Sequence, residues 1–200
     1  MENTNFTTSP QANPADAMKL ATLEIMSMNQ AMLFSKEQCE DIVNGCIDDL
    51  WLNSRVVGDT QLHQARRQKL KGDPQDFPFD PIRQITKQAN DEIYDFKLLG
   101  IIDQDFPQVY QYKQDDFYKM HLDINPMAAT RKLSFIINLT DASEYEGGGL
   151  EFLNADTDTN SINEQGALLI FPAFLPYQIK PVTSGVKNII IGHIHGAVFR

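Results

Sequence analysis

The sequence predicts a mainly β, α+β domain, built as a double-sheet jelly roll or related barrel with helices packed outside one sheet. The chain has 200 residues, of which 42% are hydrophobic and 22% charged, as expected for one medium-sized domain with a core. Helical periodicity is confined to the first half of the chain. After about residue 95, short apolar runs recur between Gly, Pro, Asp and Asn, which is typical of many short strands.

The domain organisation follows from where the apolar residues occur. Residues 1–16 are rich in Thr, Asn, Pro and Ala, which bury too little apolar surface to become ordered, so we expect a flexible leader there. A single domain is predicted over residues 17–200. Its helical part covers 17–94 and its β-barrel core covers 95–200.

Two helices are expected before the β core. Ser35 can cap the first helix, with Gln38 three residues later as in a capping box, and apolar residues follow at three- and four-residue spacing. The second helix is predicted to begin near Asp80 and Pro81, because proline suits the first turn of a helix. The buried face of this second helix would carry Ile82, Ile85, Ala89, Ile93 and Tyr94.

The β core is expected to consist of short strands bounded by turn residues. These runs are rich in β-branched and aromatic residues. The expected strands are 95–99, 108–113, 117–123, 132–139, 149–153, 166–171, 177–181 and 187–194. Ahead of them, the polar stretch 53–78 is expected to be a long loop that covers a substrate at the mouth of the barrel.

The charge balance argues against some classes of partner. A formal charge of -10 and a pI near 4.7 do not favour binding to nucleic acid or to an anionic membrane, because both attract basic patches. The basic cluster around Arg66, Arg67 and Lys69 lacks aromatic neighbours for stacking on bases, so we expect it in a solvated loop. The chain has no secretory signal and no run near the roughly 18 apolar residues of a membrane span, which predicts a soluble, cytoplasmic protein.

The pair His121 and Asp123 is the first candidate for chemistry. On a strand, the single residue between them lets both side chains point to one face, and Tyr118 would point to the other. Non-haem iron(II) sites that react with O2 use two histidines and one carboxylate on one side of the metal. The spacing alone is not specific, because Lys119 could pair with Asp123 in a site without metal.

The last expected strand offers further candidates. Alternation places Lys187, Ile189, Ile191 and His193 on one face of this strand. If that face lines the barrel interior, Lys187 is a buried ammonium group that requires an anion, which a dicarboxylate co-substrate could supply. If the strand lies at an edge, Lys187 and His193 are in solvent. The residues alone leave both possibilities open.

Several motifs in the second half follow the order found in a known family. They are Gln111-Tyr112, Asp116 to Asp123, Arg131 to Ser134, Tyr145 to Leu150, Phe171 to Pro176 and Pro181 to Lys187. The stretch of about 108–196 resembles the iron(II)- and 2-oxoglutarate-dependent dioxygenases of the prolyl-4-hydroxylase-like group, in particular the bacterial PKHD-type hydroxylases. This resemblance implies a double-stranded β-helix core, which is a jelly-roll or cupin-like arrangement.

The resemblance implies roles for five residues. His121 and Asp123 match the first two iron ligands of the family. Lys187 matches the basic residue that pairs with the far carboxylate of 2-oxoglutarate, and the hydroxyl of Tyr112 could donate to the same carboxylate. Asn138 is a weaker candidate for binding the keto acid. A plain core aromatic is the alternative for Tyr112, and a satisfied strand-end amide is the alternative for Asn138.

One position departs from the family pattern. The second iron-binding histidine of the family lies ten residues before the basic residue, where this chain has Tyr177. Three readings remain: the Tyr177 phenolate binds iron, His193 replaces the missing imidazole, or a third protein ligand is lacking and the metal site is impaired. His195 matches a family histidine in the trailing turn and is expected to be structural. His63 precedes the barrel and is expected at the surface.

Two functions are compatible with these features. The leading expectation is an enzyme that uses Fe(II), 2-oxoglutarate and O2 to hydroxylate a C–H bond, releasing succinate and CO2, with ascorbate as a further implied cofactor. Its substrate would be a peptidyl, prolyl-type group or a small molecule. The alternative is a non-catalytic or metal-impaired protein of the same fold that acts as a binding module, and Tyr177 is the residue that favours it.

Overall fold

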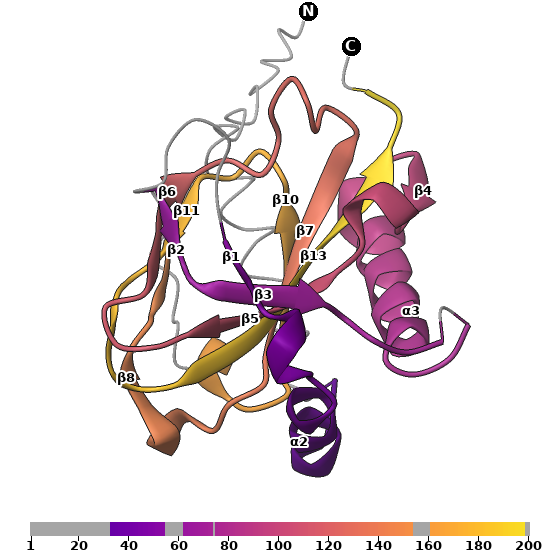
Figure 1. The fold of residues 1–200 in the computed structure, drawn as a ribbon. Coiled ribbons are helices and arrows are strands. Elements are labelled where there is room, and N and C mark those ends of the chain that lie inside the picture. Colours follow the sequence, from indigo (N-terminus) through magenta and orange to yellow (C-terminus); the bar gives the residue numbers. More distant parts are fainter. Residues whose placement is uncertain (1–32, 55–61, 74, 154–160, 199–200) are drawn as a thin grey trace, which may run out of the picture.

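Two β-sheets enclose the interior of the computed structural model, and helices lie outside the larger sheet (Figure 1). The structure describes residues 33–54, 62–73, 75–153 and 161–198. The expected leader at 1–16 lies outside these described residues. No helix in the described part of the chain has the length and apolar character needed to cross a membrane.

The larger sheet has the strand order β1-β3-β5-β13-β7-β10, and β4 also pairs with β13. Its strands are β1 (Leu52–Asn53), β3 (Arg66–Lys69), β4 (Leu98–Gly100), β5 (Gln108–Tyr112), β7 (Arg131–Asn138), β10 (Leu168–Pro172) and β13 (Lys187–Gly196). β13 lies between β5 and β7, and all ten of its residues are buried. The possibility that this strand forms an edge, with Lys187 in solvent, is therefore wrong.

The smaller sheet faces the larger one and has the order β2-β6-β11-β9. Its strands are β2 (His63–Gln64), β6 (Phe117–His121), β9 (Leu150–Phe152) and β11 (Tyr177–Ile179). A separate ribbon joins β8 (Tyr145–Gly147) to β12 (Val182–Gly185). This ribbon was not predicted, because three or four residues that include Gly give little alternation of apolar and polar side chains.

Side chains of β13 contribute alternately to two hydrophobic cores. Ile189 and Ile191 pack into the core between the two sheets, whereas Ile190 and Ile194 pack into the core under the helices. The predicted alternation along this strand is thus confirmed. Lys187 lines the same cavity as Ile189, so its side chain belongs to the barrel interior.

Both predicted helices are present, but each α-helix ends before the last residue of its predicted apolar spacing, which ran to Leu50 in the first and to Tyr94 in the second. They are α2 (Lys36–Asn44) and α3 (Phe79–Ala89), which continues into the π-turn η2 (Asn90–Tyr94). Short 3-10 turns are η1 (Asp48–Leu50), η3 (Asp103–Asp105), η4 (Ala142–Glu144) and η5 (Ser161–Asn163). The capping box at Ser35 is present: its side chain accepts from the Gln38 N–H, and the Gln38 side chain accepts from the Ser35 N–H.

The expected loop at 53–78 is wrong in part, because it contains strands β2 and β3. β3 pairs with β5, and its half-buried Arg66 and Arg67 donate to the side chains of Gln111 and Gln108. Polar residues that pair with polar residues on the next strand leave no apolar alternation to detect. The proposed lid at this stretch includes positions outside the described residues.

A glycine on the central strand should be sensitive to any added side chain. A Cβ atom at Gly192 would lie 2.3 Å from the ring of the fully buried Phe135. We expect Gly192→Ala to lower the free energy of unfolding by about 1–3 kcal/mol, as overpacking of a core does. Urea unfolding would measure the change.

Gly149→Ala is the matched control, because a Cβ atom there meets nothing within 4 Å. This variant should unfold at or slightly above the wild-type midpoint. Equal midpoints for the two variants would show that the sheet yields at Gly192 and would contradict the prediction.

Candidate active site

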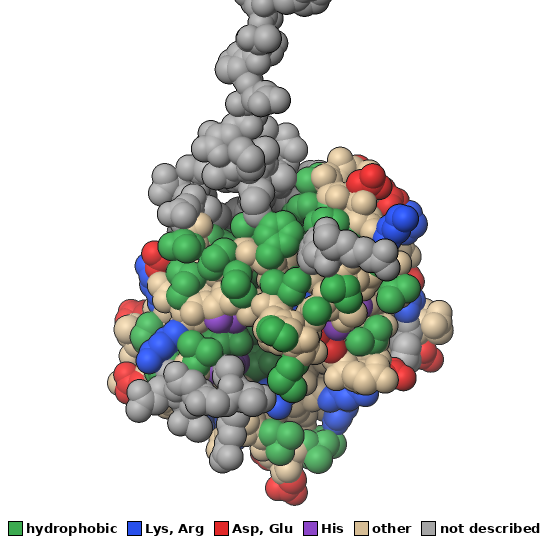
Figure 2. Space-filling view, turned by 90° about the horizontal axis from the view of Figure 1, so that it is seen from above, with side chains coloured by type: hydrophobic (Ala, Val, Ile, Leu, Met, Phe, Trp, Pro, Cys, Tyr) green, Lys and Arg blue, Asp and Glu red, His purple; other side chains and the backbone are tan. Residues whose placement is uncertain are grey.

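The predicted pair His121 and Asp123 lies at the end of β6, on the wall formed by the smaller sheet. The His121 Nε2 atom is 3.4 Å from Asp123 Oδ1, and the two side chains are only 6% and 5% exposed. In the view from above, histidine side chains are partly visible among hydrophobic ones (Figure 2). Burial raises the pKa of Asp123, but the neighbouring His193 and His121 outweigh burial and hold the pKa well below its usual range.

A β-bulge changes which side chains share a face with His121. Across the ladder, His121 pairs with Tyr177 and Tyr118 pairs with Ile179, so β6 contains one more residue than β11 over this span. The rings of Tyr118 and His121 consequently stack, with centroids 3.5 Å apart. The expectation that Tyr118 points away from His121 is wrong, because strict alternation does not hold through a bulge.

The two carboxylate oxygens of Asp123 have different partners. Oδ1 faces His121, whereas Oδ2 accepts a 2.6 Å hydrogen bond from the Ser134 hydroxyl and lies 3.5 Å from His193 Nε2. His193 is therefore brought to the site, at the carboxylate oxygen that faces away from His121. Its other ring nitrogen, Nδ1, lies 3.2 Å from the Asp105 carboxylate.

Asp105 is the most connected acidic residue of the site, and sequence reasoning missed it. Its carboxylate accepts two hydrogen bonds from the Arg131 guanidinium, at 2.6 and 2.9 Å, and lies within 3.2 Å of His193 and 3.0 Å of His195. Arg131 also donates to the backbone oxygen of Asp123 at 2.9 Å. A lone Asp in a short 3-10 turn carries no pattern that distinguishes it from a solvated turn residue.

His195 is 3% exposed and is held on both ring nitrogens. Nε2 lies 3.0 Å from Asp105, and Nδ1 lies 2.9 Å from the Thr130 hydroxyl. This arrangement agrees with the structural role expected for His195. Both of its nitrogens have partners, which leaves neither one free for a ligand.

Tyr177 lies directly beside His121 on the neighbouring strand. Their ring centroids are 4.4 Å apart, and the Tyr177 hydroxyl is buried without a hydrogen-bond partner. Burial, followed by the negative charge of Asp123, raises the pKa of Tyr177 well above its usual value. In this environment the side chain is a neutral phenol.

The donor atoms around Asp123 fit an iron ion with two protein ligands. His121 Nε2 is buried and without a hydrogen-bond partner, and it lies beside Asp123 Oδ1; imidazole and carboxylate are both ligands that iron(II) accepts. Among the described residues, no group of three His, Cys, Asp or Glu side chains is arranged to hold a metal ion. The Tyr177 hydroxyl, on the strand beside His121, is a further buried oxygen without a hydrogen-bond partner.

Lys187 provides a buried positive charge deeper in the barrel. Its ammonium group donates to the Gly148 carbonyl at 2.7 Å and lies 4.9 Å from the centroid of the Tyr145 ring. No carboxylate of the described residues lies within ion-pair distance of Lys187. Burial lowers the pKa of Lys187 to about 8. A buried ammonium without a counter-ion is well suited to bind a carboxylate.

The space around Lys187 is lined mainly by aliphatic side chains and measures only about 10 Å³. The residues lining it are Ile136, Asn138, Gly148, Leu150, Ile162, Ile179, Lys187 and Ile189. Lys187 and Asn138 contribute the polar side chains of this lining.

Tyr112 and Asn138, the other predicted co-substrate residues, border the same interior. Tyr112 is fully buried and lies opposite Lys187 in the β5–β13 ladder. The Asn138 amide donates to the backbone oxygens of Thr140 and Asn163 at 2.8 and 2.7 Å. Its Oδ1 is buried without a partner, and an acceptor oxygen does not favour a carboxylate. The contacts of Asn138 thus resemble those of a strand-end amide.

His63 is not at the surface, contrary to expectation. The residue is 4% exposed, because β2 joins the edge of the smaller sheet and carries His63 inward. Its Nε2 atom lies 2.9 Å from the hydroxyl of Tyr112. A two-residue strand is too short to give a periodic signal, so the sequence could not reveal this burial.

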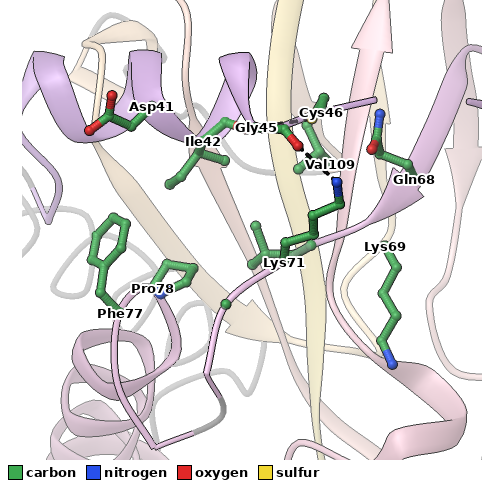
Figure 3. Close-up of a pocket in the computed structure, with 12 residues that line it drawn as sticks. Asp41, Ile42, Gly45, Cys46, Gln68, Lys69, Lys71, Phe77, Pro78 and Val109 are labelled. Carbon is green, nitrogen blue, oxygen red and sulfur yellow. Dashed lines mark hydrogen bonds between the residues drawn. The ribbon is translucent and has the colours of Figure 1, made fainter. Parts of the chain in front are cut away.

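A separate pocket of about 240 Å³ lies between α2 and β3, away from these residues (Figure 3). In Figure 3 the Lys71 side chain reaches the carbonyl of Gly45, which accepts its hydrogen bond at 3.0 Å. The pocket also includes Ile42, Cys46 and Val109, which pack against or within the core under the helices. It is therefore on the opposite side of the larger sheet from His121.

The sequence of the β core is similar to proteins of a known family. Residues 107–195 match the model of the 2OG-Fe(II) oxygenase superfamily. A PKHD-type hydroxylase of Idiomarina loihiensis is 30% identical over 91 residues, which are 45% of this chain and 42% of that protein. A PKHD-type hydroxylase of a Synechococcus species is 35% identical over 82 residues, which are 40% of this chain and 37% of that protein. The chain spans about two fifths of the length of these curated relatives.

Solved structures confirm the predicted fold. A prolyl-4-hydroxylase of Pseudomonas putida superposes with a TM-score of 0.64 at 16% identity, covering 89% of this chain and 99% of that one. The viral collagen prolyl hydroxylase of Paramecium bursaria Chlorella virus-1 gives 0.57 at 18% identity, covering 83% and 93%. The two facing sheets therefore form a double-stranded β-helix core.

Removing the Asp105 carboxylate should destabilise the fold, because Arg131 and two histidines would lose their shared acceptor. We expect Asp105→Ala to lower the free energy of unfolding by about 2–4 kcal/mol, somewhat less than for a fully buried pair. Thermal or urea unfolding would measure the loss. Asp103→Ala, an exposed residue in the same turn, should change stability by less than about 0.5 kcal/mol. Similar effects for both variants would contradict the prediction.

Proposed function

We propose that this protein, whose residues 107–195 carry the 2OG-Fe(II) oxygenase pattern, is a 2-oxoglutarate- and iron(II)-dependent hydroxylase. The observation that carries the proposal is the combination of the buried pair His121 and Asp123 with Lys187, a buried cation without a protein carboxylate partner in the described structure. The products would be a hydroxylated substrate, succinate and CO2. A double-stranded β-helix core supports the assignment.

The residues divide into two groups by what they would hold. His121 and Asp123 would bind iron(II), which together with 2-oxoglutarate would activate O2, the oxidant of the C–H bond. Lys187 would pair with the far carboxylate of 2-oxoglutarate, and Tyr112 would donate to it from the opposite strand. The hydrophobic side chains between the sheets would exclude water from this space.

The geometry favours Tyr177 over His193 at the third corner of the iron site. Tyr177 lies on the His121 side of Asp123, whereas His193 lies beside Asp123 Oδ2, between Asp123 and Asp105. The Tyr177 hydroxyl and His193 Nε2 are both buried without a hydrogen-bond partner, so position is what separates them. We assign His193 to positioning Asp123 rather than to iron. A phenol binds iron less readily than an imidazole does, because it must first lose its proton. The site should therefore bind iron weakly.

The substrate of the enzyme is proposed from its relatives. One solved relative is a prolyl hydroxylase of Trichoplax adhaerens in complex with a peptide fragment of a hypoxia-inducible factor; it has a TM-score of 0.60 at 14% identity and covers 95% of this chain and 94% of that one. We propose a peptidyl, prolyl-type substrate, with a small molecule as the alternative. Use of ascorbate stays a prediction.

A second function is a non-catalytic binding module that retains the fold. Two observations favour this function: the presence of Tyr177, and the lack, among the described residues, of a group of three His, Cys, Asp or Glu side chains arranged to hold a metal ion. The retained set of His121, Asp123 and Lys187 opposes it, since a binding scaffold has no physical reason to bury all three together.

Anaerobic titration with iron(II) and 2-oxoglutarate separates the two functions. The hydroxylase should develop a weak metal-to-ligand charge-transfer band in the visible range, and it should release succinate when O2 is admitted. A wild-type protein that shows neither band nor succinate would be the binding module. In that case, a Tyr177→His variant that gains both would identify Tyr177 as the cause of the loss.

The role of His193 can be tested in the same titration. As a residue that orients Asp123, it should lose about tenfold to 100-fold in iron affinity when changed to Ala, the usual range for an outer partner of a metal ligand. His121→Ala should weaken binding further, because it removes a ligand. Equal losses in the two variants would instead make His193 a direct ligand.

Binding of 2-oxoglutarate should weaken as the pH rises past about 8, the pKa of Lys187. Below this pKa the ammonium is charged and pairs with the carboxylate, whereas above it the amine is neutral and the attraction is lost. Calorimetric titration between pH 6.5 and 9.5 should show this fall, up to about tenfold for each pH unit. Lys187→Arg should flatten the dependence, since a guanidinium stays charged throughout. An unchanged slope in this variant would exclude Lys187 as the cause.

A further inference from the structure

His63 is a buried side chain to which the proposed function assigns no task. It comes from the segment before the barrel and reaches the interior because β2 pairs with β6, with His63 opposite Tyr118. A further hydrogen bond, from the Lys119 N–H to the Leu62 carbonyl at 2.9 Å, holds this pairing. The segment is thus fixed to the same strand that ends in His121.

The imidazole of His63 connects the two sheets. Its Nε2 atom lies 2.9 Å from the hydroxyl of Tyr112, which belongs to β5 of the larger sheet and lies opposite Lys187. His63 itself belongs to the smaller sheet. The contact therefore fixes the hydroxyl group that the proposed function assigns to the co-substrate.

The same imidazole begins a column of stacked rings that ends at the proposed iron ligand. The centroids of His63 and Tyr118 are 3.7 Å apart with an interplanar angle of 4°. Those of Tyr118 and His121 are 3.5 Å apart at 14°. A displacement of the His63 ring would thus alter its hydrogen bond with Tyr112 and, through Tyr118, the ring packing of His121.

We infer that His63 is a positioning residue of the co-substrate site: it donates Nε2–H to the Tyr112 oxygen, so that the phenol hydrogen is left to donate to a carboxylate. This inference rests on the proposed function. A neutral imidazole has one N–H group and one acceptor nitrogen. With the hydrogen on Nε2, Tyr112 accepts from His63 and remains a donor. With the hydrogen on Nδ1, His63 would accept the phenol hydrogen and withdraw it from the co-substrate.

The surroundings keep His63 neutral. Burial, with smaller contributions from His121 and Arg67, lowers the pKa of His63 to about 3. Burial also raises the pKa of Tyr112 well above its usual value. Both partners are then uncharged throughout the usual working range of pH, and their shared hydrogen bond depends on the tautomer alone.

The wild-type protein tests the tautomer directly. Long-range proton–nitrogen NMR on histidine-labelled protein should show His63 as the Nε2–H tautomer, with its signals assigned by comparison with His63→Phe. A His63 found as the Nδ1–H tautomer would overturn the inference. This measurement needs neither iron nor turnover.

Two variants separate the hydrogen bond from the ring stack. His63→Phe retains a ring against Tyr118 but removes the donor, and we expect 2-oxoglutarate to bind the metal-free protein about threefold to tenfold more weakly, as for the loss of one hydrogen bond. His63→Gln restores a donor and should recover part of the affinity. Gln64→Ala, an exposed residue of the same strand, is the matched control and should bind like wild type. Circular dichroism would verify that each variant is folded.

A double-mutant cycle with Tyr112→Phe completes the test. If His63 acts through the Tyr112 hydroxyl, His63→Phe should have no further effect once that hydroxyl is absent. Full additivity, or unchanged affinity in His63→Phe with a folded protein, would overturn the inference. Failure of the wild-type protein to bind 2-oxoglutarate both without metal and in the presence of iron(II) would instead reject the proposed function. The two failures are thus distinguishable.

Discussion

The Asp105 carboxylate is the interaction on which the rest of the site depends. This carboxylate contacts the side chains of Arg131, His193 and His195. Arg131 and His193 also contact Asp123. Burial alone would raise the pKa of Asp105, but its hydrogen bonds with His193 and Arg131 hold it below the usual range. One ionised group therefore fixes three basic side chains and, through them, the orientation of the proposed iron ligand.

The fold could be predicted where the sequence is periodic. Alternation along β13 identified both of its faces, and the cap at Ser35 located α2. It could not be predicted where polar residues pair with one another. Arg66 and Arg67 form a strand by bonding to polar residues of β5, and this pairing becomes visible only when the two strands are side by side. The hydrophobic pattern of the sequence does not predict such contacts.

The sequence predicted several residues of the site, but it did not predict how their side chains are arranged. The motifs predicted His121, Asp123 and Lys187 as site residues, and the side chains of all three are buried in the structure. The stacking of Tyr118 on His121 required a bulge, which shifts side chains between faces without a sequence marker. Asp105 is likewise brought to the site only by the folded chain.

The hydrogen bond between Lys187 and the Gly148 carbonyl would affect product release in the proposed reaction. Succinate keeps the far carboxylate of 2-oxoglutarate, so the lysine that captures the co-substrate would also retain the product. The Gly148 carbonyl offers the ammonium an internal partner to return to when succinate leaves. In the proposed reaction, release of succinate would therefore not leave the buried ammonium group without a partner.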